Sequence, residues 1–398
     1  FAGVNSFGYG GTNAHVTVST VPKNEIFKEQ IANPNRPIVL PLSAAADEPL
    51  SNQANAMLGK ITGNKGDVRR IATASGTQRS HLSNRAWIQG NTPEDIIAGL
   101  KSISEGQRRG ANITCGAEEN PKLMFVYTGM GPQWWAMGRT LFEKEPVYRE
   151  AIEECDVIFS EIAGWSILEA LNADEGESKV TVTNVAQPAN FVVQYGLTKL
   201  LDSWGINADG IVGHSIGEVG AAWASGSLSL EQALTVAYHR SRLQHRTAGK
   251  GGMLAVGLSP DEALEWVEEF GVKVAVAAIN GPSAVTLAGD QETLERIAEK
   301  LESLQRFNKF LQVEVPYHSP VMDEIELELK ESLKHIKSSR MHTDLISSVT
   351  GERMQGGHDA NYWWCNVRQS VLFSKAITTA VSEGYKLFVE IGPHPVLA

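Results

Sequence analysis

Cysteine, long apolar runs and net positive charge are all scarce in this 398-residue chain. The three cysteines, Cys115, Cys155 and Cys365, are far apart and lack metal-type spacing, which argues against a disulfide framework and a zinc site. No run of about 18 apolar residues occurs, so we expect no membrane-spanning helix and no membrane partner. The net charge of −11 argues against general nucleic-acid binding, because binding phosphates requires a positive face.

The start of the chain lacks the signature of a secretory leader. It begins at Phe1, without a basic segment, an apolar stretch or a small-residue cleavage site. We therefore expect a cytoplasmic segment cut from a longer polypeptide, with its thiols reduced. An anionic substrate would need local positive charge, and residues 239–250 supply it as three arginines, two histidines and a lysine.

The length predicts more than one structural unit, because single cores stop growing at roughly 250 to 300 residues. Residues 1–20 are rich in Gly, Ser and Asn and end in alternating apolar residues, which predicts a loop entering a strand. Between residues 36 and 116, the pattern predicts a small α/β unit. Its expected elements are strands at 37–43 and 85–89, helices at 48–61 and 67–75, and a helix that begins at the N-cap Thr92.

The remainder predicts an α/β fold with a mostly parallel sheet. Short apolar runs at 122–127 and 210–213 are each followed by a Gly-containing turn, and helical stretches lie between them. A strand at 344–349, a helix at 371–383 and a strand at 386–390 complete this larger, α/β-hydrolase-like part. Residues 252–316 instead read strand-helix-strand-strand-helix-strand, the order of a ferredoxin-like unit, here inserted into the larger part.

The sequence GHSIG at 213–217 has the G-x-S-x-G spacing of a nucleophile elbow, which exposes a serine hydroxyl at a sharp strand-to-helix turn. Ser215 is therefore the candidate nucleophile. A serine needs a base, and His318 follows the last strand of the inserted unit, at a domain junction where clefts form. His214 is a rival base, but side chains adjacent on a tight turn diverge, so it is expected to line the pocket.

Two further features fit acyl chemistry. The TGMG turn at 128–131 offers the N–H of Met130, which with the N–H of Ile216 would form a two-donor oxyanion hole; otherwise the turn only connects a strand to a helix. Arg240 lies on a helical stretch, and a guanidinium that faced the pocket would bind a carboxylate through two parallel hydrogen bonds. Alternatively, Arg240 lies on a solvated helix surface.

Together these residues resemble the malonyl-type acyltransferase domain of type I fatty acid synthases and polyketide synthases, over residues 120–398. Nine motifs carry the resemblance in order: GMGPQW (129–134), AQPA (186–189), GHSIGEV (213–219), AYHR (237–240), GGMLAVG (251–257), NGP (280–282), YHSPVM (317–322), YWWCNVRQSVLF (362–373) and EIGPHPVL (390–397). Where the family commonly has GQG, this chain has GMG, a form that resembles the animal enzymes.

The resemblance extends to the start of the chain. SFGYGGTNAH at 6–15 resembles the end of the ketosynthase domain that precedes such acyltransferases, and His15 would be one of its histidines, inert without the remainder of that domain. The resemblance implies a ketosynthase end at 1–20, a linker at 21–118, a large subdomain at 119–251 and 317–398, and a ferredoxin-like subdomain at 252–316.

The resemblance also implies roles for residues. Ser215 would be the nucleophile and His318 the base, held by a backbone carbonyl near residues 391–393. Gln187, His214 and Tyr317 would line the acyl pocket. Arg240 would bind the free carboxylate of the substrate.

A malonyl or methylmalonyl group would pass from coenzyme A to the phosphopantetheine thiol of an acyl carrier protein, and no metal or cofactor of the domain's own is expected. Tyr317 and Ile216 favour malonyl by the bacterial pattern, but methylmalonyl stays open.

Two other functions compete. An α/β-hydrolase such as a thioesterase shares the serine elbow and would use water as the acceptor, although that fold usually places an acid and then a histidine late in the chain. A docking or scaffold piece with a decayed acyl site is the second alternative. The joint presence of Ser215, His318 and Arg240 argues against it.

Overall fold

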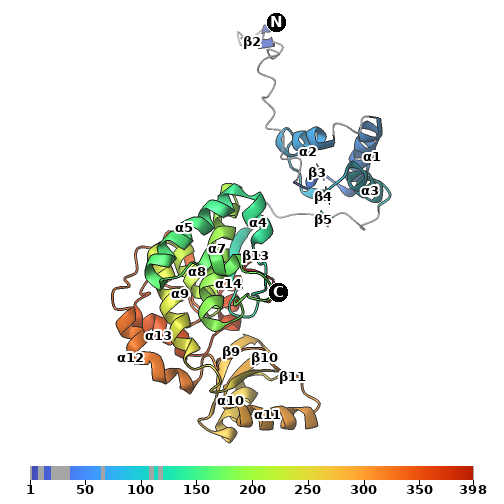
Figure 1. The fold of residues 1–398 in the computed structure, drawn as a ribbon. Coiled ribbons are helices and arrows are strands. Elements are labelled where there is room, and N and C mark those ends of the chain that lie inside the picture. The colour runs from blue at the N-terminus through green and yellow to red at the C-terminus, as the bar shows by residue number, and fades with distance from the viewer. Residues whose placement is uncertain are drawn as a thin grey trace. The chain divides into compact units, whose positions relative to one another are not determined.

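The computed structural model describes residues 2–7, 13–18, 36–63, 68–106, 112–114 and 120–397 (Figure 1). It divides into two compact units, Phe1–Asn120 and Pro121–Ala398. Each unit is described by itself below. Within the described residues, every helix falls short of the length or apolarity needed to cross a bilayer.

The first unit begins with a two-stranded antiparallel ribbon of β1 (Ala2–Phe7) and β2 (Asn13–Val18). The sequence predicted only the second of these strands. The first was missed because its residues, AGVNSF, include small and polar types that carry little strand signal. His15, on β2, contacts Asn5 and Thr17 through its ring nitrogens.

The rest of this unit is a three-stranded antiparallel sheet of order β3-β4-β5 with three helices. The elements are β3 (Ile38–Ala44), α1 (Asp47–Gly63), α2 (Val68–Thr77), β4 (Asn84–Gly90), α3 (Pro93–Ser104) and β5 (Asn112–Thr114). Leu40 and Leu42 of β3 alternate inward and meet Ile96 and Leu100 of α3 in a separate core. Thr92 caps α3 as expected, in a capping box with Asp95.

The second unit is built on a parallel sheet of order β12-β7-β6-β13, which confirms the predicted fold class. Its strands are β6 (Lys122–Tyr127), β7 (Gly210–Gly213), β12 (Asp344–Ile346) and β13 (Tyr385–Ile391). Strand β12 is shorter than the predicted 344–349. The reason is a turn, in which the Ser347 hydroxyl accepts hydrogen bonds from the N–H groups of Val349 and Thr350.

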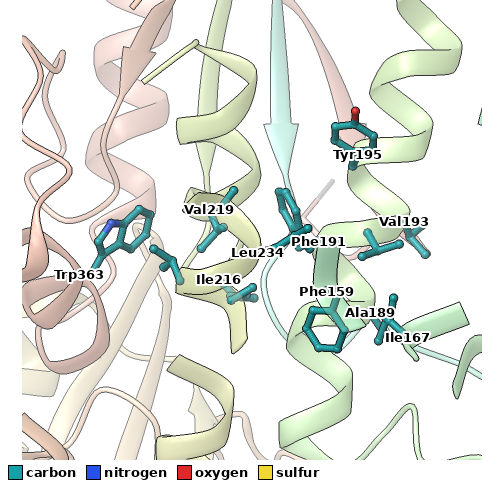
Figure 2. Packing of buried hydrophobic residues seen from close by; sticks show 14 of the residues in the cluster. Phe159, Ile167, Ala189, Phe191, Val193, Tyr195, Ile216, Val219, Leu234 and Trp363 are labelled. Atoms are coloured by element: carbon teal, nitrogen blue, oxygen red, sulfur yellow. The ribbon is translucent and has the colours of Figure 1, made fainter. Parts of the chain in front are cut away.

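Helices flank this sheet and supply the largest core (Figures 1 and 2). They are α4 (Arg139–Lys144), α5 (Pro146–Ala163), α6 (Ile167–Asn172), α7 (Thr183–Ser203), α8 (Gly217–Ala224), α9 (Leu230–His245), the 3-10 helix η2 (Pro320–Ile325), α12 (Glu326–Ser332), α13 (Ala360–Arg368) and α14 (Phe373–Ser382). Ile216 and Val219 at the start of α8 belong to the same core cluster as Phe191 of α7 and Trp363 of α13. Core packing therefore fixes the start of α8.

The inserted unit has the predicted order β8 (Gly252–Val256), α10 (Pro260–Phe270), β9 (Val274–Gly281), β10 (Ala284–Gly289), α11 (Gln291–Ser303) and β11 (Asn308–Phe310). Its sheet is antiparallel with order β11-β8-β10-β9, and its own core joins strands and helices. Strand β11 ends at Phe310, well before residue 316, where the inserted unit was predicted to end. After Phe310 the chain turns, with Val313 donating its N–H to the carbonyl of Leu311.

Candidate active site

Ser215 stands at the turn between β7 and α8, with a left-handed backbone of φ 53°. The flanking glycines permit this turn because there is no room for a side chain. A Cβ on Gly213 would lie 2.4 Å from the backbone nitrogen of Glu218, and one on Gly217 would lie 2.2 Å from the carbonyl oxygen of Tyr127. The elbow is thus strained at the serine and possible only because its neighbours are glycine.

Ser215 Oγ lies 2.8 Å from Nε2 of His318, and both residues are buried. His318 has a left-handed backbone too, with φ 59°. Its Nδ1 lies 2.9 Å from the carbonyl oxygen of Gln369. Since a carbonyl only accepts, Nδ1 carries the proton and Nε2 is free to accept one from the serine.

The predicted source of the carbonyl that holds His318 was wrong: it is Gln369, not the segment 391–393. That segment instead holds the turn at 128–131 and the residues after it. The carbonyl of Ile391 accepts the N–H of Thr128 at 3.1 Å, and the carbonyl of Pro393 accepts Nε1–H of Trp134 at 3.1 Å. The end of the chain therefore supports the candidate oxyanion loop rather than the candidate base.

Arg240 of α9 is 1% exposed, so the alternative of a solvated surface arginine is wrong. Its Nη2 donates to Ser215 Oγ at 3.0 Å, and its Nε donates to Asn366 Oδ1 at 3.1 Å. Its Nη1 donates to the side-chain oxygens of Gln187 and Gln244, the latter at 3.1 Å. The guanidinium is thus fixed by four neutral acceptors, and none of these partners carries a negative charge.

Burial and charge set the protonation states of the pair. Burial lowers the pKa of Arg240 to about 10, so the guanidinium stays charged at neutral pH. Burial, then the positive charge of Arg240, lower the pKa of His318 to about 3. At neutral pH the site therefore combines a neutral imidazole with a cation, both within hydrogen-bonding distance of one serine hydroxyl.

Gln187 and Tyr317, two of the predicted pocket residues, lie around this centre. Gln187 contacts Arg240 and donates its Nε2–H to Gln244 at 2.8 Å. Tyr317, which precedes the base, pairs its hydroxyl with that of Thr183 at 2.8 Å, and burial raises its pKa. Both side chains are at least nine-tenths buried.

His214 lies before the serine, and its Nε2 is 2.8 Å from Oδ1 of Asn280 in the inserted unit. Burial lowers the pKa of His214 and keeps it neutral at pH 7. Its Nδ1 is buried without a hydrogen-bond partner. Because Nε2 of His214 is already bonded to Asn280, this arrangement argues against His214 as the general base.

The two amides expected to form an oxyanion hole lie on well-fixed backbone. Asn190 and Gln194 of α7 donate to the carbonyls of Gly129 and Thr128, at 3.3 and 2.8 Å, which orients the peptide planes before Met130. The Ile216 side chain is buried in the core, next to the serine. These contacts support a preorganised hole, and the donor role of the two amides stays a prediction.

Three polar residues of the site were not predicted from the sequence. Asn366 on α13 bonds both Arg240 and, through Nδ2, the carbonyl of Ser215 at 3.1 Å. Gln244, one turn after Arg240, completes its acceptor set. Glu218 is buried behind the elbow, where it accepts from Ser348 and Tyr362. Asn366 and Glu218 lie inside motifs noted above, which was the available signal.

No group of three or more His, Cys, Asp or Glu residues that could hold a metal ion occurs in the described part of the chain. At the site, the side chains of Ser215, His318 and Arg240 supply a nucleophile, a neutral base and a fixed cation. That combination suits covalent transfer of an acyl group that bears a negative charge.

Comparison with known proteins agrees with this chemistry. The acyl transferase domain family matches residues 124–398, and the ketoacyl-synthetase C-terminal extension family matches residues 1–88. Mycoketide-CoA synthase of Mycobacterium tuberculosis is 35% identical over 398 residues, covering 100% of this chain and 10% of that protein. Erythronolide synthase EryA2 of Saccharopolyspora erythraea is 32% identical over 399 residues, covering 100% of this chain and 11% of that protein.

The chain thus spans about a tenth of the length of these curated relatives. Among solved structures, the acyltransferase domain from module 8 of the salinomycin polyketide synthase matches with a TM-score of 0.84 and 29% identity, covering 91% of this chain and 86% of that chain. These matches favour acyl transfer over the hydrolase alternative. The chain belongs to the acyl transferase domain family of type I synthases.

Proposed function

We propose that this domain loads a malonyl-type extender unit from coenzyme A onto an acyl carrier protein through an acyl-serine intermediate. The observation that carries the proposal is the convergence of His318 and Arg240 on one serine hydroxyl, at 2.8 and 3.0 Å. A base beside the serine serves acylation in general. A buried cation beside it selects an acyl group with a free carboxylate.

In the first step, Ser215 Oγ attacks the thioester carbonyl carbon while Nε2 of His318 accepts the hydroxyl proton. The N–H groups of Met130 and Ile216 hold the oxyanion. The C–S bond then breaks, and the coenzyme A sulfur takes the proton from His318. The products are the acyl-serine ester and free coenzyme A, with the imidazole neutral again.

In the second step, the phosphopantetheine thiol of the carrier protein gives its proton to His318 and attacks the acyl-serine carbonyl. Collapse of that intermediate returns the proton to Ser215 Oγ and releases the acyl carrier thioester. The order of events predicts ping-pong kinetics. No cofactor of the domain's own takes part.

Arg240 would bind the carboxylate of the extender unit. For this, its Nη2 must give up the contact with Ser215 Oγ, which frees a donor for the substrate and the hydroxyl for attack. Gln187, Gln244 and Asn366 would keep the guanidinium in place during that exchange. An acetyl group lacks the carboxylate and leaves the buried cation without its partner, so acetyl-CoA is the disfavoured donor.

Malonyl is the extender unit favoured by Tyr317 and Ile216, with methylmalonyl as the alternative. Ketosynthase and carrier domains of a parent synthase are the proposed partners, and the cytoplasm is the proposed compartment. An animal-type origin, to which the GMG sequence points, stays a prediction.

The test is the intact mass of the protein after brief, separate exposure to acetyl-, malonyl- and methylmalonyl-CoA, together with Ser215→Ala. We expect an adduct from a dicarboxylic donor on the wild-type protein and none on the variant. Release of coenzyme A without an adduct would favour hydrolysis instead, and equal labelling of Ser215→Ala would remove Ser215 from the mechanism.

A further inference from the structure

Strand β9 lies at one edge of the sheet of the inserted unit. It runs beside the segment 369–371, which lies between α13 and α14. The N–H of Val371 donates to the carbonyl of Ala277 at 2.9 Å, and the carbonyl of Val371 accepts the N–H of Ile279 at 2.8 Å. The hydroxyl of Ser370 donates to the carbonyl of Val276. Strand β9 is therefore hydrogen-bonded to Ser370 and Val371, in a loop of the larger part.

That loop supplies the acceptor for the candidate base. Gln369, whose carbonyl accepts Nδ1–H of His318 at 2.9 Å, directly precedes Ser370 and Val371. The direction of a backbone carbonyl is set by the hydrogen bonds of the neighbouring backbone, not by the side chain of its own residue. After Val371, the N–H of Leu372 donates to the carbonyl of Ser348 at 2.6 Å. Gln369 itself donates its N–H to the carbonyl of Cys365 at the end of α13, at 2.8 Å. Strand β9 is thus one of three supports, with α13 and Ser348, that fix the direction of this carbonyl.

The end of the same strand reaches the candidate nucleophile. Asn280 accepts Nε2–H of His214, the residue immediately before Ser215, at 2.8 Å. The His214 ring also packs edge-on against Phe373, with ring centroids 5.3 Å apart. On its other side lies Gly129, where an added Cβ would be only 2.7 Å from Nδ1 of His214. The His214 ring therefore has neighbours in the inserted unit, in α14 and in the candidate oxyanion loop.

We infer that Asn280 is a positioning residue for acyl transfer, and that β9 of the inserted unit aligns both the base and the elbow. Through Val276–Ile279, β9 holds the loop whose carbonyl orients His318. Through Asn280, it holds the ring of His214, which immediately precedes Ser215 and lies close to Gly129 of the candidate oxyanion loop. The inserted unit is thus part of the catalytic geometry and not only a wall of the cleft. This inference rests on the proposed role of Ser215 and His318.

Asn280 itself is exposed, so its replacement does not disturb the core. Asn280→Leu keeps the branched shape of the side chain but removes the acceptor, which leaves Nε2–H of the partly buried His214 without this partner. Asn280→Asp keeps an acceptor oxygen in the same place. Asn308→Leu makes the same change on β11, at the opposite edge of the same sheet, and serves as the matched control.

The experiment measures two rates on each variant: malonyl-CoA acylation under saturation, and labelling by a fluorophosphonate, which reports activation of Ser215 without any acyl-CoA. We expect Asn280→Leu to slow both by about ten-fold or more, with little change in the KM for malonyl-CoA. Asn280→Asp should stay within about three-fold of the wild type, as should Asn308→Leu. A purely structural role for Asn280 does not predict rescue by aspartate over leucine.

Two results would overturn the inference: Asn280→Leu reacting at the wild-type rate, or Asn280→Asp reacting as slowly as Asn280→Leu. Thermal unfolding of each variant shows that the protein compared is folded. If wild-type protein took the fluorophosphonate but no acyl group, the proposed function would fail. The fluorophosphonate rates of the variants would still decide the role of Asn280.

Discussion

Replacing Arg240 with alanine should turn a domain that prefers dicarboxylic acyl groups into one that prefers acetyl. Arg240 is the charged group that lies nearest to Ser215 Oγ, at 3.0 Å, and its pKa of about 10 keeps it positive at neutral pH. A malonyl carboxylate would gain charge-assisted hydrogen bonds to it. An acetyl group gains none.

The size of the effect follows from those bonds. A hydrogen bond to a charged group contributes about 1.5 to 3 kcal/mol, so loss of a two-bond contact should cost about 3 kcal/mol or more. That corresponds to at least about a hundred-fold in kcat/KM for malonyl-CoA. The acetyl-CoA rate should change far less. Arg240→Lys keeps a charge but loses the planar fork, so it should recover only part of the malonyl rate.

The assay is competition between malonyl- and acetyl-CoA for the serine, read as the ratio of the two adduct masses. Arg242→Ala is the matched control, because Arg242 lies on the same helix but is partly exposed and pairs with Glu328. It should leave the ratio unchanged. Because Arg240→Ala leaves Gln187, Gln244 and Asn366 short of a donor, thermal unfolding must show that the variant is folded. An unchanged malonyl-to-acetyl ratio in folded Arg240→Ala would refute the reasoning.

Further predictions concern the base and the buried acids and histidines. His318→Ala should slow acyl-serine formation by about 10² to 10⁴-fold in rapid-quench measurements, and a wild-type rate would exclude it as the base. Since the pKa of His318 is lowered to about 3, the acylation rate should stay flat from pH 5 to 8; an inflection near 6.5 would contradict that pKa. His358, whose pKa burial lowers to about 4, is neutral when folded but charged when unfolded below about pH 6.5. Its stabilising contribution is full above that pH and should fall by about 2 kcal/mol at pH 5. In denaturant titrations, His358→Gln should therefore lose less stability on acidification than the wild type does. An equal loss of unfolding free energy between pH 7 and pH 5 in both proteins would refute this. Glu218→Gln keeps one oxygen to accept from Ser348 but turns an amide N–H₂ toward the donating hydroxyl of Tyr362, and should cost about 1 to 3 kcal/mol of unfolding free energy. Urea unfolding at the wild-type midpoint would contradict this.

The elements that could be predicted from sequence are those with strong local signals. The run at 122–127 is a strand with four consecutive buried residues, because a central parallel strand is covered on both faces. Helix α3 begins where the Thr92 capping box places it. The elbow at Ser215 was predictable because its two glycines are needed for close backbone approach.

What could not be predicted depends on contacts between distant segments. The carbonyl that holds His318 belongs to Gln369, and a backbone carbonyl leaves no mark in the residue type. Asn366 was hidden for a different reason: its amide bonds Arg240, 126 positions away, and only the fold brings the two together. Strand β12 ends before the predicted residue 349 because Ser347 forms a turn, although the β-branched Val349 follows. Strand β11 ends at Phe310, although Leu311, Val313 and Val315 continue the apolar pattern.

The most direct test of the account is the mass of the tryptic peptide that carries Ser215 after brief exposure to malonyl-CoA. The account predicts a malonyl ester on Ser215, lost when a carrier-protein phosphopantetheine thiol is added. An acyl group on another residue, or a Ser215 ester that water removes as fast as the thiol does, would contradict it.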